Sequence, residues 1–293
     1  MKSMELSVII VSFNVRDFLK HCLLSVKKAS VNIESEIFVV DNNSTDGSCE
    51  MVLREFPEIT LISNRGNSGF SAANNQGITQ SKGTFVLLLN PDTLVEEDTF
   101  SKCISFMLEH IDAGAIGVRM VNGEGRFLPE SKRALPDLKT AFFKTFGLSY
   151  FFPSSPILNR YYLSQIDSFE TSPAEVISGA FMFLRREALG KTGFLDEDFF
   201  MYGEDIDLSY RLLQIGYSNY YYPGTQIIHY KGKSTSRKNF KDIRYFYKAM
   251  RIYVRKRISE RNFNILHYII IPAIYIRESL AFLNRIYQII FTH

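Results

Sequence analysis

Short apolar runs alternate with longer amphipathic stretches through the first 120 residues. Five runs have the length and apolar content of buried strands. They cover residues 6–11, 36–40, 60–62, 84–89 and 115–118. Helix-length segments separate them, at roughly 15–30, 46–55, 68–80 and 96–110. This alternation predicts an α/β fold in which helices cover both faces of a mostly parallel sheet.

The pattern changes after the fifth run. Residues 126–173 contain five of the nine prolines and ten aromatic residues, a composition that predicts a covering subdomain or a lid over an acceptor. Regular patterning returns as a strand at 175–184, a helix at 204–215 and a short tyrosine-rich strand at 217–222.

The last 60 residues are basic and then apolar. Residues 231–261 hold twelve Lys or Arg against two acids, and two apolar stretches follow at 265–276 and 280–291. Each apolar stretch is about 12 residues long, short of the roughly 20 needed to span a bilayer. Two interpretations stay open: helices lying in an anionic membrane surface, or helices packing on the preceding domain or on the second subunit of a homodimer.

Composition and charge narrow the class of protein. The chain has 293 residues and is 46% apolar and 14% aromatic, which excludes disorder for most of it. Lys and Arg number 34 against 31 Asp and Glu, a surplus too small for a dedicated nucleic-acid binder. Three cysteines without metal-type spacing and the lack of a signal segment predict a cytoplasmic protein, peripheral on the inner face of the plasma membrane if the apolar helices bind lipid.

Polar residues follow three of the expected strands. Ser12 and Asn14 come after the first, Asp41 after the second, and Asn90 and Asp92 after the fourth. Ligands of open α/β sheets bind at these carboxyl ends. Asp41 suits a contact with a base or ribose, with a helix-capping turn as the alternative. Asp92 suits a divalent cation bound together with substrate phosphates, and the alternative is a turn initiated by Asn-Pro.

Two further segments carry weaker signals for phosphate. Asn67 and Gly69 lead into a helix that contains Asn74, and a glycine-rich helix N-terminus can receive a phosphate. His229 precedes Gly232-Lys233-Ser234, which resembles the end of a phosphate-binding loop. The earlier glycine of that motif would fall at Ile227, so a phosphate-loop NTPase is excluded. His229 remains a candidate for a metal or a diphosphate, against the alternative of a solvated basic loop.

An acidic segment, residues 196–207, is the strongest catalytic signal. Six acids among these twelve residues are interleaved with aromatic side chains. Carboxylates held among aromatic rings acquire raised pKa values and act as general bases. A helix N-terminus rich in acids accounts for some of these residues but not for the aromatic ones.

Taken in this order, the segments resemble the family 2 glycosyltransferases with the GT-A fold. The resemblance covers roughly residues 5–240, and Asn90-Pro91-Asp92 stands where the family usually has Asp-x-Asp. This variant, together with Arg133-Ala134-Leu135-Pro136, is most similar to the branch that includes rhamnosyltransferases of cell-surface polysaccharide synthesis. The matching segments are residues 7–14, 39–47, 66–70, 89–92 and 193–208.

The resemblance implies a GT-A domain over residues 1–235, with a nucleotide-sugar-binding half (1–120) and an acceptor half (121–235), followed by a helical extension over 236–293. It implies inverting transfer from a UDP- or dTDP-sugar, dTDP-rhamnose among them, to a hydroxyl of a glycan or lipid-linked acceptor. It also implies Mg²⁺ or Mn²⁺ at the diphosphate. Asn90 in place of an acid implies weaker metal affinity than in a site with two carboxylates.

The resemblance also implies roles for individual residues. Asp205 is the base that deprotonates the acceptor, with Glu204 beside it, and Asp92 and His229 are the metal ligands. The residues implied to bind the nucleotide-sugar are Ser12, Asn14, Asp41, Asn67, Gly69, Asn74, Asn90 and Asp92.

The same residues bear on two other functions. A nucleotidyltransferase of this fold carries a Gly-rich loop directly after the first strand, where this chain has residues 12–16 without a glycine. A non-catalytic sugar-nucleotide sensor or assembly subunit would have no need of a base, which Glu204 and Asp205 provide.

Overall fold

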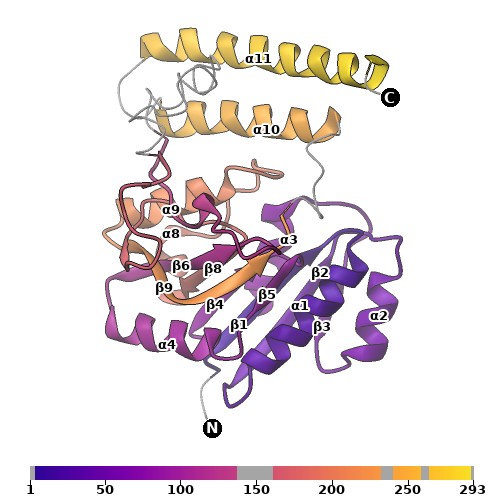
Figure 1. Cartoon of the computed structure of the whole chain (residues 1–293), viewed down its shortest axis with the longest axis vertical. Coiled ribbons are helices and arrows are strands. Elements are labelled where there is room, and N and C mark those ends of the chain that lie inside the picture. The colour runs from indigo at the N-terminus through magenta and orange to yellow at the C-terminus, as the bar shows by residue number, and fades with distance from the viewer. Residues whose placement is uncertain (1–3, 137–160, 232–239, 259–263, 292–293) are drawn as a thin grey trace.

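The computed structural model describes residues 4–136, 161–231, 240–258 and 264–291. The first half of the sheet is parallel, with β1 between β2 and β4 and with β3 beyond β2 (Figure 1). Strands β1 and β4 are apolar and almost wholly buried because helices cover both faces there. The bounds are β1 Leu6–Ser12, β2 Ser35–Asp41, β3 Thr60–Ser63 and β4 Phe85–Leu89, which confirms the first four expected strands.

The second half of the sheet is mixed. β8 pairs antiparallel with both β4 and β6, and β6 runs parallel to β9. The short strands β5 and β7 pair antiparallel with β9. The bounds are β5 Thr93–Val95, β6 Ala113–Val121, β7 Ser172–Pro173, β8 Phe181–Arg185 and β9 Ser218–His229.

Two expected strands differ in length from those observed. The strand expected at 175–184 is reduced to β8, because the chain before it makes a single bridge between Arg133 and Val176 and then turns. The short strand expected at 217–222 extends to His229, because β9 continues along β6 and then pairs with β5.

Helices cover both faces of the sheet. One buried apolar cluster joins the sheet to α1 (Arg16–Ala29), α2 (Ser48–Glu55) and α4 (Thr99–Glu109). A second cluster joins the opposite face to α3, α8 and α9. Their bounds are α3 Phe70–Gln80, α8 Arg186–Thr192 and α9 Glu204–Gln214, and a 3₁₀ turn, η1, spans Pro129–Ser131. The fold class expected from the sequence is confirmed.

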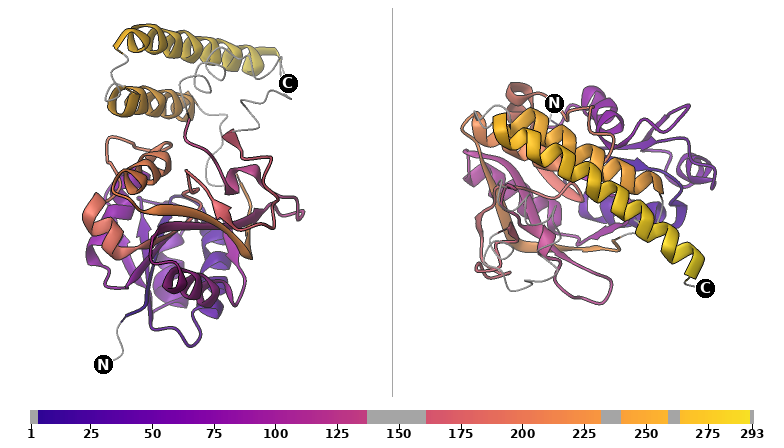
Figure 2. Two further views of the ribbon diagram at one scale, coloured as in Figure 1. Left: turned by 90° about the vertical axis from the view of Figure 1, so that its left-hand side faces the viewer. Right: turned by 90° about the horizontal axis from the view of Figure 1, so that it is seen from above.

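The C-terminal residues form a further layer. Helix α10 (Phe240–Tyr253) continues into a π-helical turn, η2 (Val254–Ile258), and α11 (Asn264–Phe291) lies along α10 on the outside of the molecule (Figures 1 and 2). The two separate apolar stretches expected here form one 28-residue helix. The charged residues between them do not end the helix, because Glu278 is buried in an ion pair with Arg251 of α10. Within the described ranges, no helix is both long and apolar enough to cross a membrane.

Some expectations concern residues that lie outside the described ranges. Residues 137–160 of the proline- and aromatic-rich segment belong to this group, as do residues 232–239 of the basic stretch.

Candidate active site

The carboxyl ends of β1, β2 and β4 lie side by side. Ser12 and Asp41 are register partners, and both are buried. One carboxylate oxygen of Asp41 accepts a hydrogen bond from the amide of Ser44 at 2.7 Å, so the turn considered as an alternative is present. The other oxygen of Asp41 and the hydroxyl of Ser12 are buried and have no hydrogen-bond partner among the described residues. Two polar groups at this edge are therefore left for a ligand.

Asn14 connects the loops after β1 and β2. Its side-chain oxygen accepts a hydrogen bond from the backbone amide of Thr45 at 2.8 Å, and its backbone amide donates to the hydroxyl of Ser44 at 2.9 Å. Asn14 has a φ of 53°, a left-handed conformation that asparagine tolerates better than most residues. Asn14 thus stabilises the edge at which Asp41 lies.

The glycine-rich segment contacts the acidic segment. A Cβ on Gly69 would lie 2.5 Å from the carbonyl oxygen of Phe200, and Gly69 has a φ of 87°. Asn67 accepts a hydrogen bond from the amide of Gly69 at 2.9 Å, and Asn74 donates to the carbonyl of Phe70 at 2.9 Å. The backbone at Gly69 therefore lies close to the backbone of Phe200, and this is the contact that requires a glycine.

Asp92 and His229 meet because β5 pairs with the end of β9. Thr93 is the register partner of His229, and the Nε2 atom of His229 lies 3.3 Å from a carboxylate oxygen of Asp92. Both side chains are buried, and the Nδ1 atom of His229 has no hydrogen-bond partner within the described part of the chain. A buried carboxylate and imidazole at this separation fit a divalent cation that takes its other ligands from a diphosphate and water. No group of three or more His, Cys, Asp or Glu with metal-site geometry occurs in the described ranges.

Asp205 lies in the first turn of α9, and its carboxylate is bound by a buried arginine. One carboxylate oxygen of Asp205 accepts hydrogen bonds from the guanidinium of Arg133 at 2.5 Å and from the amide of Gly179 at 3.2 Å. The adjacent Glu204 is buried, and its burial and the negative charge of Asp205 raise its pKa well above the usual carboxyl range. The two neighbouring carboxyl groups thus occupy unlike environments, an arrangement found where acid and base roles are divided.

Gly179 and Ala180 connect the acidic segment to the sheet edge that carries the residues expected to bind the nucleotide-sugar. The amide of Gly179 donates to Asp205, and the carbonyl of Ala180 accepts from the amide of Asn90 at 3.0 Å. Two consecutive residues thus join the loop before Asp92 to the turn that carries Asp205.

Sequence analysis does not identify Arg133 as a partner of Asp205, because the two residues are 72 positions apart. The sequence offers one indication that Arg133 has a function, its place in the Arg-Ala-Leu-Pro segment that resembles rhamnosyltransferases. The basic C-terminal stretch likewise gave no sign that Lys256 and Arg257 bind Asp196 and Asp207.

Comparisons with known proteins identify the family of the chain. The model of the family described as "Glycosyl transferase family 2" matches residues 7–193, well over half of the chain. The N-acetylglucosaminyl-diphospho-decaprenol L-rhamnosyltransferase of Mycobacterium tuberculosis is 28% identical over 265 residues, which cover 87% of this chain and 85% of that protein. The rhamnosyltransferase WbbL of Escherichia coli is 26% identical over 269 residues, covering 88% of this chain and 96% of WbbL.

Solved structures show the same fold at lower identity. The mannosyltransferase PcManGT from Pyrobaculum calidifontis, in complex with GDP-Man and Mn²⁺, superposes with a TM-score of 0.60 at 15% identity, over 96% of this chain and 76% of that chain. TarS residues 1–349 of Staphylococcus aureus superpose with a TM-score of 0.59 at 19% identity, over 99% and 73%. The chain therefore belongs to glycosyl transferase family 2, and it is a glycosyltransferase.

Proposed function

We propose that this protein transfers a rhamnosyl residue from dTDP-rhamnose, with inversion, to a sugar hydroxyl of a lipid-linked diphosphate acceptor in cell-surface polysaccharide synthesis. Two relatives that align over at least 85% of their own length are named rhamnosyltransferases, and the name of one includes N-acetylglucosaminyl-diphospho-decaprenol. The proposal rests above all on one observation, that Gly179 and Ala180 bind Asp205 on one side and the loop of Asp92 on the other.

Residues at the parallel sheet edge suit a nucleoside diphosphate. The unpaired oxygen of Asp41 and the hydroxyl of Ser12 are acceptor and donor groups for a base or ribose. Asn14, Asn67, Gly69, Asn74 and Asn90 support this edge in the proposal, through the loops that they stabilise. A divalent cation, Mg²⁺ or Mn²⁺, would be held by Asp92 and His229, and when bound it offsets the charge that develops on the leaving diphosphate.

Asp205 is the base in this proposal. Inversion requires a proton acceptor on the sugar face opposite the leaving group, and a carboxylate is suited to this. Arg133 and the amide of Gly179 fix the orientation of one carboxylate oxygen. Burial raises the pKa of Glu204, so Glu204 keeps its own proton to a higher pH than an ordinary carboxyl group. A protonated Glu204 does not compete with Asp205 for the acceptor proton.

A thermal-shift panel tests the donor. UDP-, dTDP-, GDP- and CMP-sugars are compared with and without Mn²⁺, and a ligand at about 100 times its Kd adds roughly 2.7 kcal/mol to stability. We expect a Mn²⁺-dependent rise of the melting temperature with dTDP-rhamnose and rhamnosyl transfer to a polyprenyl-diphospho-N-acetylglucosamine. If only another nucleotide class raises the melting temperature, that class is the donor in place of dTDP-rhamnose. If no nucleotide-sugar raises the melting temperature of a folded sample, the proposed donor site is wrong.

We further propose that α11 binds an anionic membrane surface, where a lipid-linked acceptor would be found. Eleven large apolar side chains of α11 are exposed, as many as in all other described residues together. Ile269, Ile276, Leu283 and Ile290 recur at intervals of seven residues, so they lie on one helix face. Residues 231–261 carry twelve basic residues against two acids, and four of the twelve, Lys231, Arg251, Lys256 and Arg257, are paired with acids outside this stretch. The net positive charge that is left disfavours pairing of two copies of the extension and favours anionic lipid.

The membrane surface is tested with charges placed on that face. The triple variant Ile276→Glu, Leu283→Glu, Ile290→Glu should lose co-sedimentation with phosphatidylglycerol vesicles. The control variant Leu53→Glu, Leu108→Glu, Ile111→Glu changes three apolar side chains elsewhere on the molecule that are at least as exposed, and it should bind normally. Unchanged vesicle binding by the first variant would contradict the proposal, and so would a homodimer that this variant converts to monomers.

A further inference from the structure

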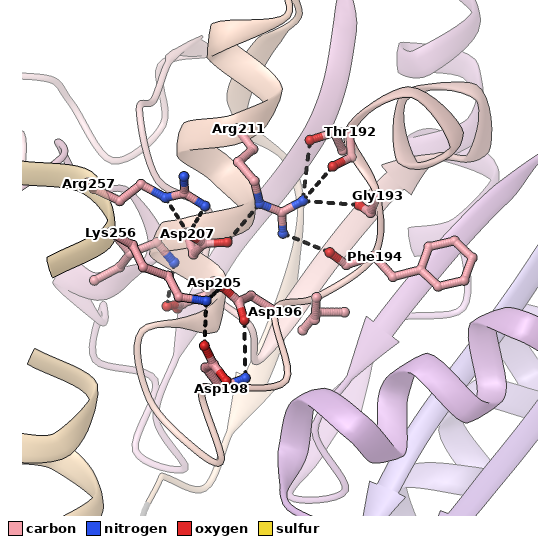
Figure 3. Close-up of polar contacts among 12 residues, drawn as sticks. Thr192, Gly193, Phe194, Asp196, Asp198, Asp205, Asp207, Arg211, Lys256 and Arg257 are labelled. Carbon is pink, nitrogen blue, oxygen red and sulfur yellow. Dashed lines mark hydrogen bonds and ion pairs between the residues drawn. The ribbon is translucent and has the colours of Figure 1, made fainter. Parts of the chain in front are cut away.

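The C-terminal layer is bound to the acidic segment by two consecutive basic residues. The ammonium of Lys256 lies 2.6 Å from a carboxylate oxygen of Asp196 and 2.6 Å from one of Asp198. Arg257 donates from Nε and Nη2 to one carboxylate oxygen of Asp207, each at 2.6 Å (Figure 3). The turn η2 thus contacts the acidic segment at its beginning and at its end.

Asp207 is the centre of this network. It has no solvent exposure, and its second oxygen accepts a hydrogen bond from the Nε of Arg211 at 2.7 Å. Arg211 also donates to three consecutive backbone carbonyls just before the acidic segment (Figure 3). A buried carboxylate shared by two guanidiniums depends on both, because each neutralises part of a charge that water cannot reach. Asp207 therefore joins α9, η2 and the chain that enters the acidic segment.

The network acts on the same helical turn as Asp205. Asp205 and Asp207 are both in the first turn of α9, which begins at Glu204 after a left-handed Gly203. Arg133 binds this turn through Asp205, and Arg257 binds it through Asp207. The rings of Phe200 and Tyr245 stack at a centroid distance of 4.3 Å, a further contact of the acidic segment with α10.

We infer that Arg257 is a positioning residue for the catalytic carboxylate Asp205, assisted by Lys256, so that transfer depends on the C-terminal layer being docked on the domain. The inference rests on the proposed function, in which Asp205 is the base. Arg257 touches neither reactant in this account. It fixes the turn from which Asp205 reaches the acceptor hydroxyl, and a small displacement of a reacting group is enough to lower the rate strongly.

The test compares Arg257→Gln, Arg257→Lys and Lys256→Gln in the full-length chain, with Arg255→Gln as the matched control. Arg255 belongs to the same π-helical turn and is exposed. Rhamnosyl transfer from dTDP-rhamnose to polyprenyl-diphospho-N-acetylglucosamine is measured, together with dTDP and Mn²⁺ binding and the melting temperature. If the panel names another donor, that donor and its nucleotide are used.

We expect Arg257→Gln to lower kcat at least about tenfold, on the scale of a misplaced reacting group, while dTDP binding stays within about twofold. Arg257→Lys should retain most of the rate, because lysine keeps a positive charge that can pair with the carboxylate of Asp207. Lys256→Gln should lower kcat by about threefold, and it provides the test if Arg257→Gln does not fold, because Lys256 is partly exposed. Arg255→Gln should match the unmodified protein.

Four results would overturn the inference, and one of them also overturns the assignment of the base. Normal kcat in folded Arg257→Gln, beside an inactive Asp205→Asn, overturns the inference alone. If Arg257→Gln does not fold, normal kcat in Lys256→Gln has the same consequence. Normal kcat in Asp205→Asn overturns the assignment of the base and the inference that depends on it. Equal losses in Arg257→Gln and Arg257→Lys, accompanied by lost dTDP binding, would indicate general damage to the fold and would also overturn it.

Discussion

The parallel sheet edge and the acidic segment differ in how their polar groups are satisfied. At the edge, the hydroxyl of Ser12 and one oxygen of Asp41 are buried and unpaired among the described residues. In the acidic segment, Asp205 and Asp207 are bound by Arg133 and Arg257 from distant parts of the chain, and Asp207 also by Arg211, four residues further along α9. The edge is thus built to receive partners, whereas the acidic segment is already held by them.

This difference has a physical reason. A ligand that brings its own hydrogen-bonding groups and charge completes the edge, and leaving buried polar groups unpaired otherwise costs free energy. A base must instead be in place before the acceptor arrives, so its orientation has to come from the protein.

The largest effect is expected for Asp205→Asn. Removing a general base lowers kcat by about 10²–10⁴-fold, while dTDP binding should stay normal because the sheet edge is intact. Steady-state transfer kinetics and isothermal titration check both expectations. Glu197→Gln is the control, since Glu197 is exposed in the same segment. A variant that keeps more than about a tenth of the rate would remove Asp205 from its role.

On the edge side, Asp92→Asn should weaken the gain in dTDP binding that Mn²⁺ provides by about 10–100-fold. The amide keeps the shape of the side chain but has no negative charge to offer a cation beside His229. Titration of dTDP with and without Mn²⁺ measures this gain. Asp98→Asn, at an exposed position between β5 and α4, serves as the control. An unchanged Mn²⁺ dependence would contradict the metal assignment.

The contact between the two regions is tested by Gly69→Ala. A methyl group there meets the carbonyl oxygen of Phe200 and forces alanine into a left-handed backbone, so the variant should lose roughly 1–3 kcal/mol of stability. Gly66→Ala is the control, because a Cβ at Gly66 has nothing within 4 Å. Urea unfolding compares the two. Equal stability of both variants would show that Gly69 does not need to be glycine.

The smallest effect concerns Glu204→Gln. Burial and Asp205 raise the pKa of Glu204 above its value in the unfolded chain. The folded protein therefore binds more protons between the two pKa values, and stability falls as the pH rises through that window. Glutamine does not titrate, so this fall should be reduced. Urea unfolding from about pH 5 to about pH 9 measures it, and identical curves for both proteins would contradict the raised pKa.

Much of the sheet edge could be predicted because its determinants are local. The apolar runs before Ser12, Asp41 and Asn90 predict strands, and parallel neighbours bring their carboxyl ends together without further information. The acidic segment was found by its composition, which identified Glu204 and Asp205 as candidates. The C-terminal stretch allows two interpretations from its sequence, and in the structure Tyr245 and Phe246 of α10 pack on Phe200 and Tyr202 of the acidic segment while α11 keeps an apolar face exposed.

The order and periodicity of the segments specify the fold class, and the residue types after the strands and in the acidic segment predict the candidate site. Periodicity and strand–helix alternation are properties of neighbouring residues, so a single chain displays them directly. Only the tertiary structure decided that His229 meets Asp92 through the β5–β9 pairing. It also decided that Arg133 and Arg257 bind the turn of Asp205 from two sides. Such contacts join residues far apart in the chain, and no local pattern specifies which charge pairs with which.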